Sequence, residues 1–294
     1  MSKTKPAAKL SLWSFSTIPR RGTVRWRTYD DRRHGYASDI TAPGIAANQQ
    51  SRTPSFNYDF SMSASRSANG NRLLSVLPAK QWQSLQKGGA LQQVALALGE
   101  VVHEPASHID YVYFPEDCVI SLMAAEDGRM SIEVGLVGGE GMAGIAVAMG
   151  STVSPVRALV QRDGSALRMT AAAFHTLYEG SPPLKLAVSH YAHGLMVQAT
   201  QAAFCSHFHL LESRLARSLL TMRDRVHSNA LHLTHEFLAH ALGVRRVGIT
   251  KAATSLQQRG LISYSRGDIR ILDDAGLEHA ACTCYQVVKT LAGA

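Results

Sequence analysis

The chain has 294 residues, of which 46% are hydrophobic and 18% are charged, and its formal net charge is +8. This length allows two domains with apolar cores, and the absence of an apolar run of about 18 to 20 residues argues against a membrane-spanning protein. The cysteines are too few and too scattered for a disulfide framework, and they fit a reducing compartment. We therefore expect a cytoplasmic protein.

The positive charge is concentrated in residues 1–70. This segment contains eleven Lys or Arg and four Asp, a net charge of +7, which leaves +1 for the rest of the chain. It is rich in Ser, Arg, Ala, Asn and Gly and has no sustained apolar period, so we predict a disordered basic extension. The total charge therefore says little about whether the folded part binds a polyanion, and local patterns must decide.

Short apolar runs separated by turn residues follow between residues 101 and 169. They lie at 111–114, 119–122, 132–137 and 158–160, with Pro, Gly, Asp and Glu between them. This pattern predicts a compact antiparallel β domain, either a roll or a sandwich. We expect short helices before it, within residues 72–98, and a helix after it over residues 171–179.

One long helix is predicted over residues 181–226. Ser181-Pro182-Pro183 is a typical helix start, and apolar residues then recur at spacings of three and four from Val188 to Met222. A helix of this length spans about 60 Å, more than one small domain needs, so we expect pairing with its twin in a homodimer. Small residues at Gly194, Ala199 and Ala202 would permit close approach of two helices. The alternative is an amphipathic helix that lies on its own β domain.

Residues 233–256 have the pattern of a helix, a tight turn and a second helix. Thr234 is suited to cap the first helix, and Gly243 supplies the positive φ that a sharp turn requires. In such a motif the second helix lies in the major groove of DNA. It begins near Arg245, with Ile249, Ala253 and Leu256 on its inner face. Residues 257–272 follow as two alternating runs around Arg266-Gly267-Asp268, which predicts a β-hairpin wing with Arg266 at its tip.

The capped turn, the basic helix start and the basic hairpin together predict binding of double-stranded DNA. The expected contacts come from both helices and from the wing. They are Thr234, His235, Arg245, Arg246, Val247, Thr250, Lys251 and Arg266.

These segments resemble the Crp/Fnr family of bacterial transcription regulators, from about Asn71 to Leu272. The strongest match is LTHEFLAHALGVRRVGITKAATSLQQRGLISYSRGDIRILD, supported by YVYFPEDCVISL. The resemblance implies an α+β fold: an N-terminal β-roll sensor domain like those that bind cyclic nucleotides, a long dimerisation helix and a C-terminal winged helix-turn-helix. The corresponding boundaries are 1–70 for the extension, 71–180 for the sensor, 181–226 for the helix and 227–294 for the DNA-binding domain.

The resemblance also bears on what the recognition helix reads. Family members commonly present Arg, Glu and Arg to the bases, and the matching positions here are Arg246, Val247 and Lys251. Without a carboxylate at Val247 an acceptor for a cytosine amino group is lost. The operator, expected to be palindromic, should therefore differ from the family's best-known one.

The effector cannot be read from the sequence. Cyclic-nucleotide binders of the family carry Gly-Glu followed at a fixed distance by Arg; Gly139-Glu140 is present, but residues 141–154 contain no Arg and Arg157 aligns poorly. These three residues form a weak candidate pocket for an unknown small molecule, and cyclic AMP binding of the usual kind is not expected. An N-terminal iron–sulfur cluster is excluded because no Cys precedes Cys118.

We predict no metal ion and no cofactor. His190, His193, His207 and His209, with Cys205, could be read as haem or metal ligands, but scattered His residues are usually surface or interface residues. Cys282 and Cys284 could be redox active, although two thiols near a chain end are more often incidental.

The function predicted is a homodimeric, sequence-specific transcription regulator that is not an enzyme and that contacts RNA polymerase as a further partner. One alternative is a small-molecule-binding module that acts through protein contacts. Another is a cupin-like metalloenzyme, in view of His103 and His108 in the β domain.

Overall fold

The computed structural model describes residues 70–126 and 130–291. The predicted basic extension, apart from its last residue, lies outside the described residues. None of the described helices is long and apolar enough to cross a membrane.

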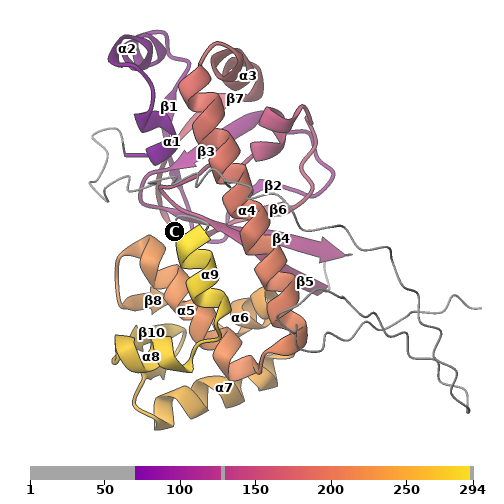
Figure 1. Ribbon diagram of the computed structural model, residues 1–294, viewed down its shortest axis with the longest axis vertical. Coiled ribbons are helices and arrows are strands. Elements are labelled where there is room, and N and C mark those ends of the chain that lie inside the picture. The colour runs from indigo at the N-terminus through magenta and orange to yellow at the C-terminus, as the bar shows by residue number, and fades with distance from the viewer. Residues whose placement is uncertain (1–69, 127–129, 292–294) are drawn as a thin grey trace, which may run out of the picture. The chain divides into compact units, whose positions relative to one another are not determined.

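The β-rich half is built from two antiparallel sheets (Figure 1). A three-stranded sheet has the order β1-β7-β3, and a four-stranded sheet has the order β2-β6-β4-β5. Its strands are β1 (Gln92–Leu96), β2 (Val101–His103), β3 (Tyr111–Pro115), β4 (Val119–Glu126), β5 (Met130–Val137), β6 (Arg157–Arg162) and β7 (Gly164–Thr170). The predicted antiparallel β domain is therefore confirmed, and four of these strands cover the predicted apolar runs.

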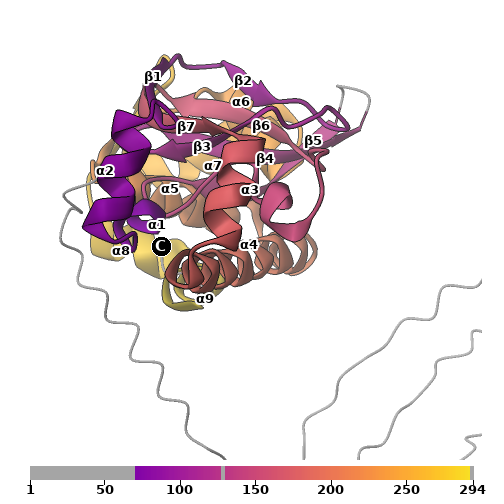
Figure 2. The same ribbon diagram turned by 90° about the horizontal axis from the view of Figure 1, so that it is seen from above.

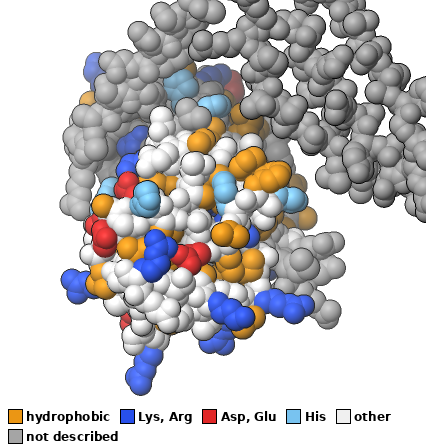
Figure 3. Space-filling model, turned by 60° about the horizontal axis from the view of Figure 1, so that its bottom comes forward, with side chains coloured by type: hydrophobic (Ala, Val, Ile, Leu, Met, Phe, Trp, Pro, Cys, Tyr) orange, Lys and Arg blue, Asp and Glu red, His pale blue; other side chains and the backbone are white. Residues whose placement is uncertain are grey.

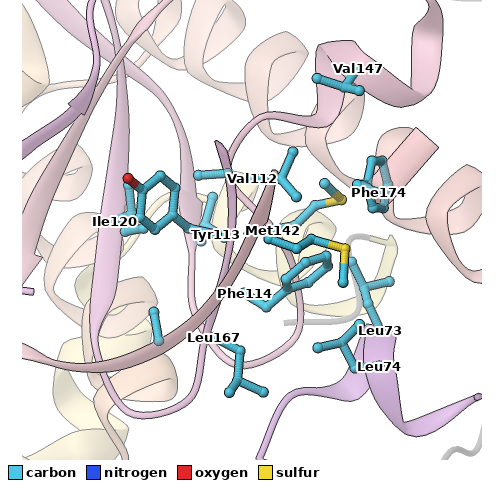
Figure 4. Packing of buried hydrophobic residues seen from close by; sticks show 14 of the residues in the cluster. Leu73, Leu74, Val112, Tyr113, Phe114, Ile120, Met142, Val147, Leu167 and Phe174 are labelled. Carbon is cyan, nitrogen blue, oxygen red and sulfur yellow. The ribbon is translucent and has the colours of Figure 1, made fainter. Parts of the chain in front are cut away.

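A first hydrophobic core fills the space between these sheets and the neighbouring helices. Phe114 of β3 and Phe174 of α3 (Ala171–Glu179) are fully buried, with ring centroids 6.0 Å apart. Figure 4 shows them with Met142, while Leu73 and Leu74 of α1 (Arg72–Ser75) close one side. The short 3-10 helix η1 (Ile145–Met149) contributes Val147.

The segment before the sheets differs from the prediction. Helix α2 (Ala79–Lys87) ends at Gly88, and the next apolar residues form strand β1 rather than more helix. Gly89 has a φ of 66°, which glycine adopts without strain and which stops the helix. Val94 and Leu96 then alternate with exposed residues along β1, which pairs with β7. That pairing brings together residues far apart in sequence, so a local pattern could not reveal it.

The predicted single helix over 181–226 is divided into two. Helix α4 covers Pro182–Phe208 and helix α5 covers Leu211–Val226. His209 and Leu210 have extended backbone angles, with ψ values of 145° and 147°, so the axis changes direction between them. Neither residue is Pro or Gly, and the apolar spacing continues through the break, which is why the sequence suggested one helix.

Helix α4 packs on its own β domain and still has an exposed apolar face. Val188 and Tyr191 are buried in the first core, and Gly194 and Ala202 are also buried. Viewed from above, α4 lies along one side of the strands with α3 beside it (Figure 2). The buried face of α4 therefore agrees with the alternative expectation, an amphipathic helix that lies on its own β domain. Other apolar side chains of α4 are exposed to solvent.

The C-terminal half has its own core around α5. Helices α6 (His235–Leu242) and α7 (Arg246–Gln258) and the sheet of order β8-β10-β9 surround it. The strands of this sheet are β8 (Ala230–His232), β9 (Ile262–Ser265) and β10 (Asp268–Ile271), and two further helices follow, α8 (Asp274–Ala280) and α9 (Cys284–Leu291). The sequence had indicated β9 and β10 but neither β8 nor the last two helices.

A buried ion pair connects the two halves. Arg225 of α5, whose side chain is 2% exposed, donates from Nε to Glu140 Oε1 at 3.0 Å, and to the Leu136 carbonyl of β5 at 3.0 Å. Arg225 also donates to the Thr221 carbonyl at 3.1 Å. Since an unpaired charge is costly away from water, this pair holds the end of α5 against the loop after β5.

Replacing Arg225 with Met should destabilise the chain by about 3 to 5 kcal/mol, because Glu140 would be left buried without its cation. Adding Glu140→Gln should restore part of the loss. As a control, Arg259→Met removes the far more exposed Arg259–Glu212 pair and should cost about 0 to 1 kcal/mol. Denaturant unfolding of the variants provides the comparison. Equal losses for Arg225→Met and Arg259→Met would contradict the structural role of the buried pair.

Candidate DNA-binding interface

Helices α6 and α7 form a helix-turn-helix whose geometry is set by two residues. The Thr234 hydroxyl accepts a hydrogen bond from the Phe237 N–H at 3.1 Å and so caps α6. Gly243 follows Leu242 with a φ of 62° and a ψ of 42°, the left-handed conformation that ends the helix. Both predicted roles are present in the structure.

One face of α7 is fixed in the core, and this decides which side chains point outward. Ile249 and Leu256 are fully buried, and Ala252 and Ala253 nearly so. They pack in one cluster with Leu215 and Leu219 of α5. The opposite face of α7 is consequently exposed.

The exposed face of α7 carries most of the predicted contact residues. Arg246, Val247, Thr250 and Lys251 are exposed, at spacings that place them on one side of the first two turns. Val247 is 61% exposed, so its side chain is open to a partner at this surface. Thr254 lies one turn further along the same face and was missed by the sequence analysis, although its spacing of four from Thr250 could have indicated it.

The cations near this face are not neutralised by the protein itself. Among the described residues, Arg245, Arg246, Lys251 and Arg266 form no salt bridge. Figure 3 views the molecule from its lower side and shows Lys and Arg side chains along the lower part, with most Asp and Glu to the left and centre. Unpaired exposed cations are suited to bind phosphate.

The wing is a tight hairpin between β9 and β10. Arg266 and Gly267 have φ values of 50° and 95°, so both central residues of the turn are left-handed, as in a type I′ turn. The hairpin is held to β8 by antiparallel pairing and by the Leu233 N–H, which donates to the Gly267 carbonyl at 2.7 Å. Arg266 is thereby placed at the tip, as predicted.

His235 is buried, although we expected it to face DNA. Its ring stacks on Tyr264 of β9, with centroids 4.0 Å apart and an interplanar angle of 10°, and only 8% of the residue is exposed. Thr250 Oγ1 donates to the Arg246 carbonyl at 3.2 Å, so it accepts from His235 Nδ1 at 3.1 Å. His235 therefore fastens α6 to α7 and to the wing rather than presenting its ring to solvent.

The candidate effector residues do not form a shared pocket. The Glu140 carboxylate is engaged by Arg225, and Arg157 of β6 forms its ion pair with Glu104 at 2.9 Å. Tyr191 of α4 covers the next residue, because its ring occupies the space that a Cβ at Gly141 would need. Glu140 is thus used to position α5, and its carboxylate is not available to a ribose in this arrangement.

The family comparison agrees with the geometry of the interface. Residues 213–280 match the family model of the Crp-like helix-turn-helix domain, a span that contains the interface from α5 to α8. Among curated proteins no sequence is significantly similar to the chain.

Solved structures of Crp/Fnr regulators share the fold over 65% to 72% of the chain. A regulator assigned to this family from Eubacterium rectale aligns with a TM-score of 0.58 at 20% identity, covering 72% of this chain and 98% of that one. FixK2 of Bradyrhizobium japonicum aligns with a TM-score of 0.57 at 12% identity, covering 66% and 98%. A Crp/Fnr-family regulator from Thermus thermophilus gives 0.55 at 22% identity, covering 65% and 98%.

Residues 213–280 therefore form a Crp-like helix-turn-helix domain. The β-rich N-terminal region and the helices that follow it share the fold of solved Crp/Fnr regulators.

The stability of the winged helix should fall as the pH drops below the ordinary His value of 6.5. Burial, and secondly the positive charge of Arg246, lower the pKa of His235. The unfolded chain therefore takes up this proton at a higher pH than the folded chain, so stability is retained above pH 6.5 and lost as the pH falls. Unfolding free energies measured between about pH 8 and pH 5.5 test this.

His235→Phe, which can still stack on Tyr264, should reduce that pH dependence. His279→Phe, at an exposed position of α8, should keep the wild-type pH dependence. If His235→Phe lost as much stability on acidification as the wild type, the buried ring would not be the group responsible.

Proposed function

We propose that the chain is a homodimeric, sequence-specific regulator that inserts α7 of each subunit into the major groove of an operator with two related half-sites. The observation that carries this proposal is the exposed face of α7: Arg246, Val247, Thr250 and Lys251, flanked by Thr234 and Arg266. The N-terminal residues of a recognition helix are those that reach base edges.

The side chains on this face of α7 determine which bases the helix can recognise. Arg246 and Lys251 are donors suited to the O6 and N7 acceptors of guanine, and the exposed Val247 is suited to the methyl group of thymine. With no carboxylate on the first turn of α7, an acceptor for a cytosine amino group is absent there. Arg245, Arg266 and the hydroxyl of Thr234 are exposed and would contact phosphates, which fix the register.

Dimerisation through α4 is supported by its exposed apolar side chains. Leu186, Met196, Phe204 and Phe208 are 59%, 61%, 47% and 71% exposed, and their spacing places them on one face of the helix. Apolar side chains gathered on one face usually mark an interaction surface. Paired α4 helices would set two copies of α7 about 34 Å apart, the distance between half-sites one DNA turn apart.

We assign the domains as 71–180 for the sensor, 181–226 for the dimerisation segment and 227–294 for DNA binding. The β domain would bind an unidentified small molecule and transmit the effect of binding to α5 through the Glu140–Arg225 pair. The regulator would act in the cytoplasm and contact RNA polymerase. A ligand that binds one dimer geometry more tightly than another would shift the dimer toward that geometry, and the affinity for DNA would change with it.

Replacing Arg246 with Ala should weaken binding to the selected operator by about 10- to 100-fold and relax the base preference at one position of each half-site. The measurement is selection of bound sequences from random duplex DNA, followed by titration at two salt concentrations.

Two matched variants distinguish recognition of bases from nonspecific attraction to the phosphates. Arg266→Asn keeps a residue that tolerates the left-handed turn. It should weaken all sequences alike and lower the salt slope by about 1 per subunit, or about 2 for the dimer. Arg259→Ala removes an Arg near the far end of α7 that pairs with Glu212 and should leave the base preference unchanged. Unchanged operator affinity in Arg246→Ala, or no enriched sequence with any variant or the wild type, would overturn the proposal.

The pair Leu186→Glu and Met196→Glu should convert a dimer into monomers, since it places charges in the apolar face of α4. Sedimentation or light scattering measures the mass, and operator affinity should fall with it. Met149→Glu, at a 65% exposed Met of η1, is the control and should remain dimeric. A dimer that survives both α4 substitutions would place the interface elsewhere.

A further inference from the structure

Four potential metal ligands from distant parts of the sequence meet beside the break between α4 and α5. They are Cys205 in the last turn of α4, His209 at its end, Cys282 between α8 and α9, and Cys284 at the start of α9. Their sulfur and nitrogen atoms all lie within 4.8 Å of one another. Figure 1 shows α9 beside the lower part of α4, and the two helices are in contact.

The distances fit a tetrahedral ion. Cys205 Sγ lies 3.4 Å from Cys282 Sγ, and Cys284 Sγ lies 3.4 Å from His209 Nδ1. With zinc bonds of about 2.3 Å to sulfur and 2.0 Å to nitrogen, ligand atoms at the corners of a tetrahedron are about 3.5 to 3.8 Å apart. Small side-chain rotations would therefore place all four atoms at bonding distance from one ion.

The surroundings suit a closed structural site. Cys205, Cys282 and Cys284 are 0%, 8% and 1% exposed, so solvent has little access to the thiols. Three thiolates and one imidazole are the soft ligand set that zinc takes in structural sites, and no ligand position is left open for catalysis.

The local charges favour a thiolate. Arg217 of α5 lies close enough for its positive charge to act on Cys205, Cys282 and Cys284. The Nε of Arg217 is buried and has no hydrogen-bond partner among the described residues. A cation beside the cluster would balance the net negative charge of three thiolates on one divalent ion.

We propose that Cys205, His209, Cys282 and Cys284 bind one zinc ion, which ties the C-terminal helix to the end of α4. This site differs from the expectation of no metal ion. Of the four His residues considered with Cys205, only His209 belongs to this cluster. Cys282 and Cys284, expected to be incidental thiols near a chain end, are two of its members. Zinc would hold the extended residues between α4 and α5 in one geometry, and with them the base of the helix-turn-helix.

The test begins with the metal content of the full chain. Protein without a His tag, purified under reducing conditions without chelators, should contain about one zinc ion per chain. After removal of zinc, titration with Co²⁺ should give the visible bands of tetrahedral cobalt and the near-ultraviolet absorption of thiolate bound to cobalt. Chelation should lower the thermal unfolding midpoint and make three further thiols reactive to a thiol reagent.

Matched variants locate the site. His209→Ala and Cys284→Ser should lose zinc, whereas His207→Ala and Cys118→Ser should retain it, since His207 is exposed and Cys118 is buried in the other core. Should a variant fail to fold, the cobalt spectrum of the wild type still decides. Absence of both zinc and the cobalt spectrum, retention of zinc in His209→Ala and Cys284→Ser, iron in place of zinc, or a Cys205–Cys282 disulfide in the native protein would each overturn the proposal.

One consequence rests on the proposed function. If the ion fixes the base of the DNA-binding domain, Cys284→Ser should weaken operator binding at least about tenfold. Arg246→Ala should weaken operator binding but keep its zinc. Metal content and DNA affinity are measured separately, so zinc without DNA binding would refute only the proposed function, and DNA binding without zinc would refute only the metal site.

Discussion

Helix α5 is the element on which the rest of the molecule depends. Leu215, Leu219 and Leu220 are fully buried, and they share one cluster with Val119 and Leu136 of the β domain and with the inner face of α7. The same helix carries Arg225 into a pair with Glu140. Because packed cores deform in discrete steps rather than continuously, a shift of α5 must change both its contacts with β5 and the position of α7.

In this arrangement Glu140 has a structural role that its sequence context did not suggest. The pair Gly139-Glu140 matched part of a nucleotide-binding pattern, but in the folded chain its carboxylate is held by an Arg on α5. Both ions of the pair are largely withdrawn from water, so separating them is costly, and a ligand that competed for Glu140 would have to supply a replacement cation. The same contact that stabilises the fold therefore joins the loop after β5 to the end of α5.

The sequence predicted best those features that depend on neighbouring residues. A Thr cap, a Gly with positive φ and a tight hairpin turn are each decided within a few residues, and Thr234, Gly243 and Gly267 all take the expected conformations. The buried residues of α7 recur with the helical period, so the residues exposed on the opposite face could also be predicted. What the local pattern did not show was the partner of each side chain. His235 lies at the start of a helix, where exposure is common, but Tyr264 of the wing covers it.

The break between α4 and α5 shows the same limit at longer range. The apolar spacing runs through His209 and Leu210 without interruption, so nothing local predicts an end to the helix there. In the structure the end of α4 lies against residues from the last helix, and Cys205 and Cys282 are separated by 77 positions yet lie in contact. A helix that continued past Phe208 would carry His209 onward in the helical register. Its extended backbone instead leaves the imidazole 3.4 Å from Cys284 Sγ. The break and the cysteine cluster are thus parts of one arrangement, in which the C-terminal helix α9 lies against the end of α4, where α5 begins.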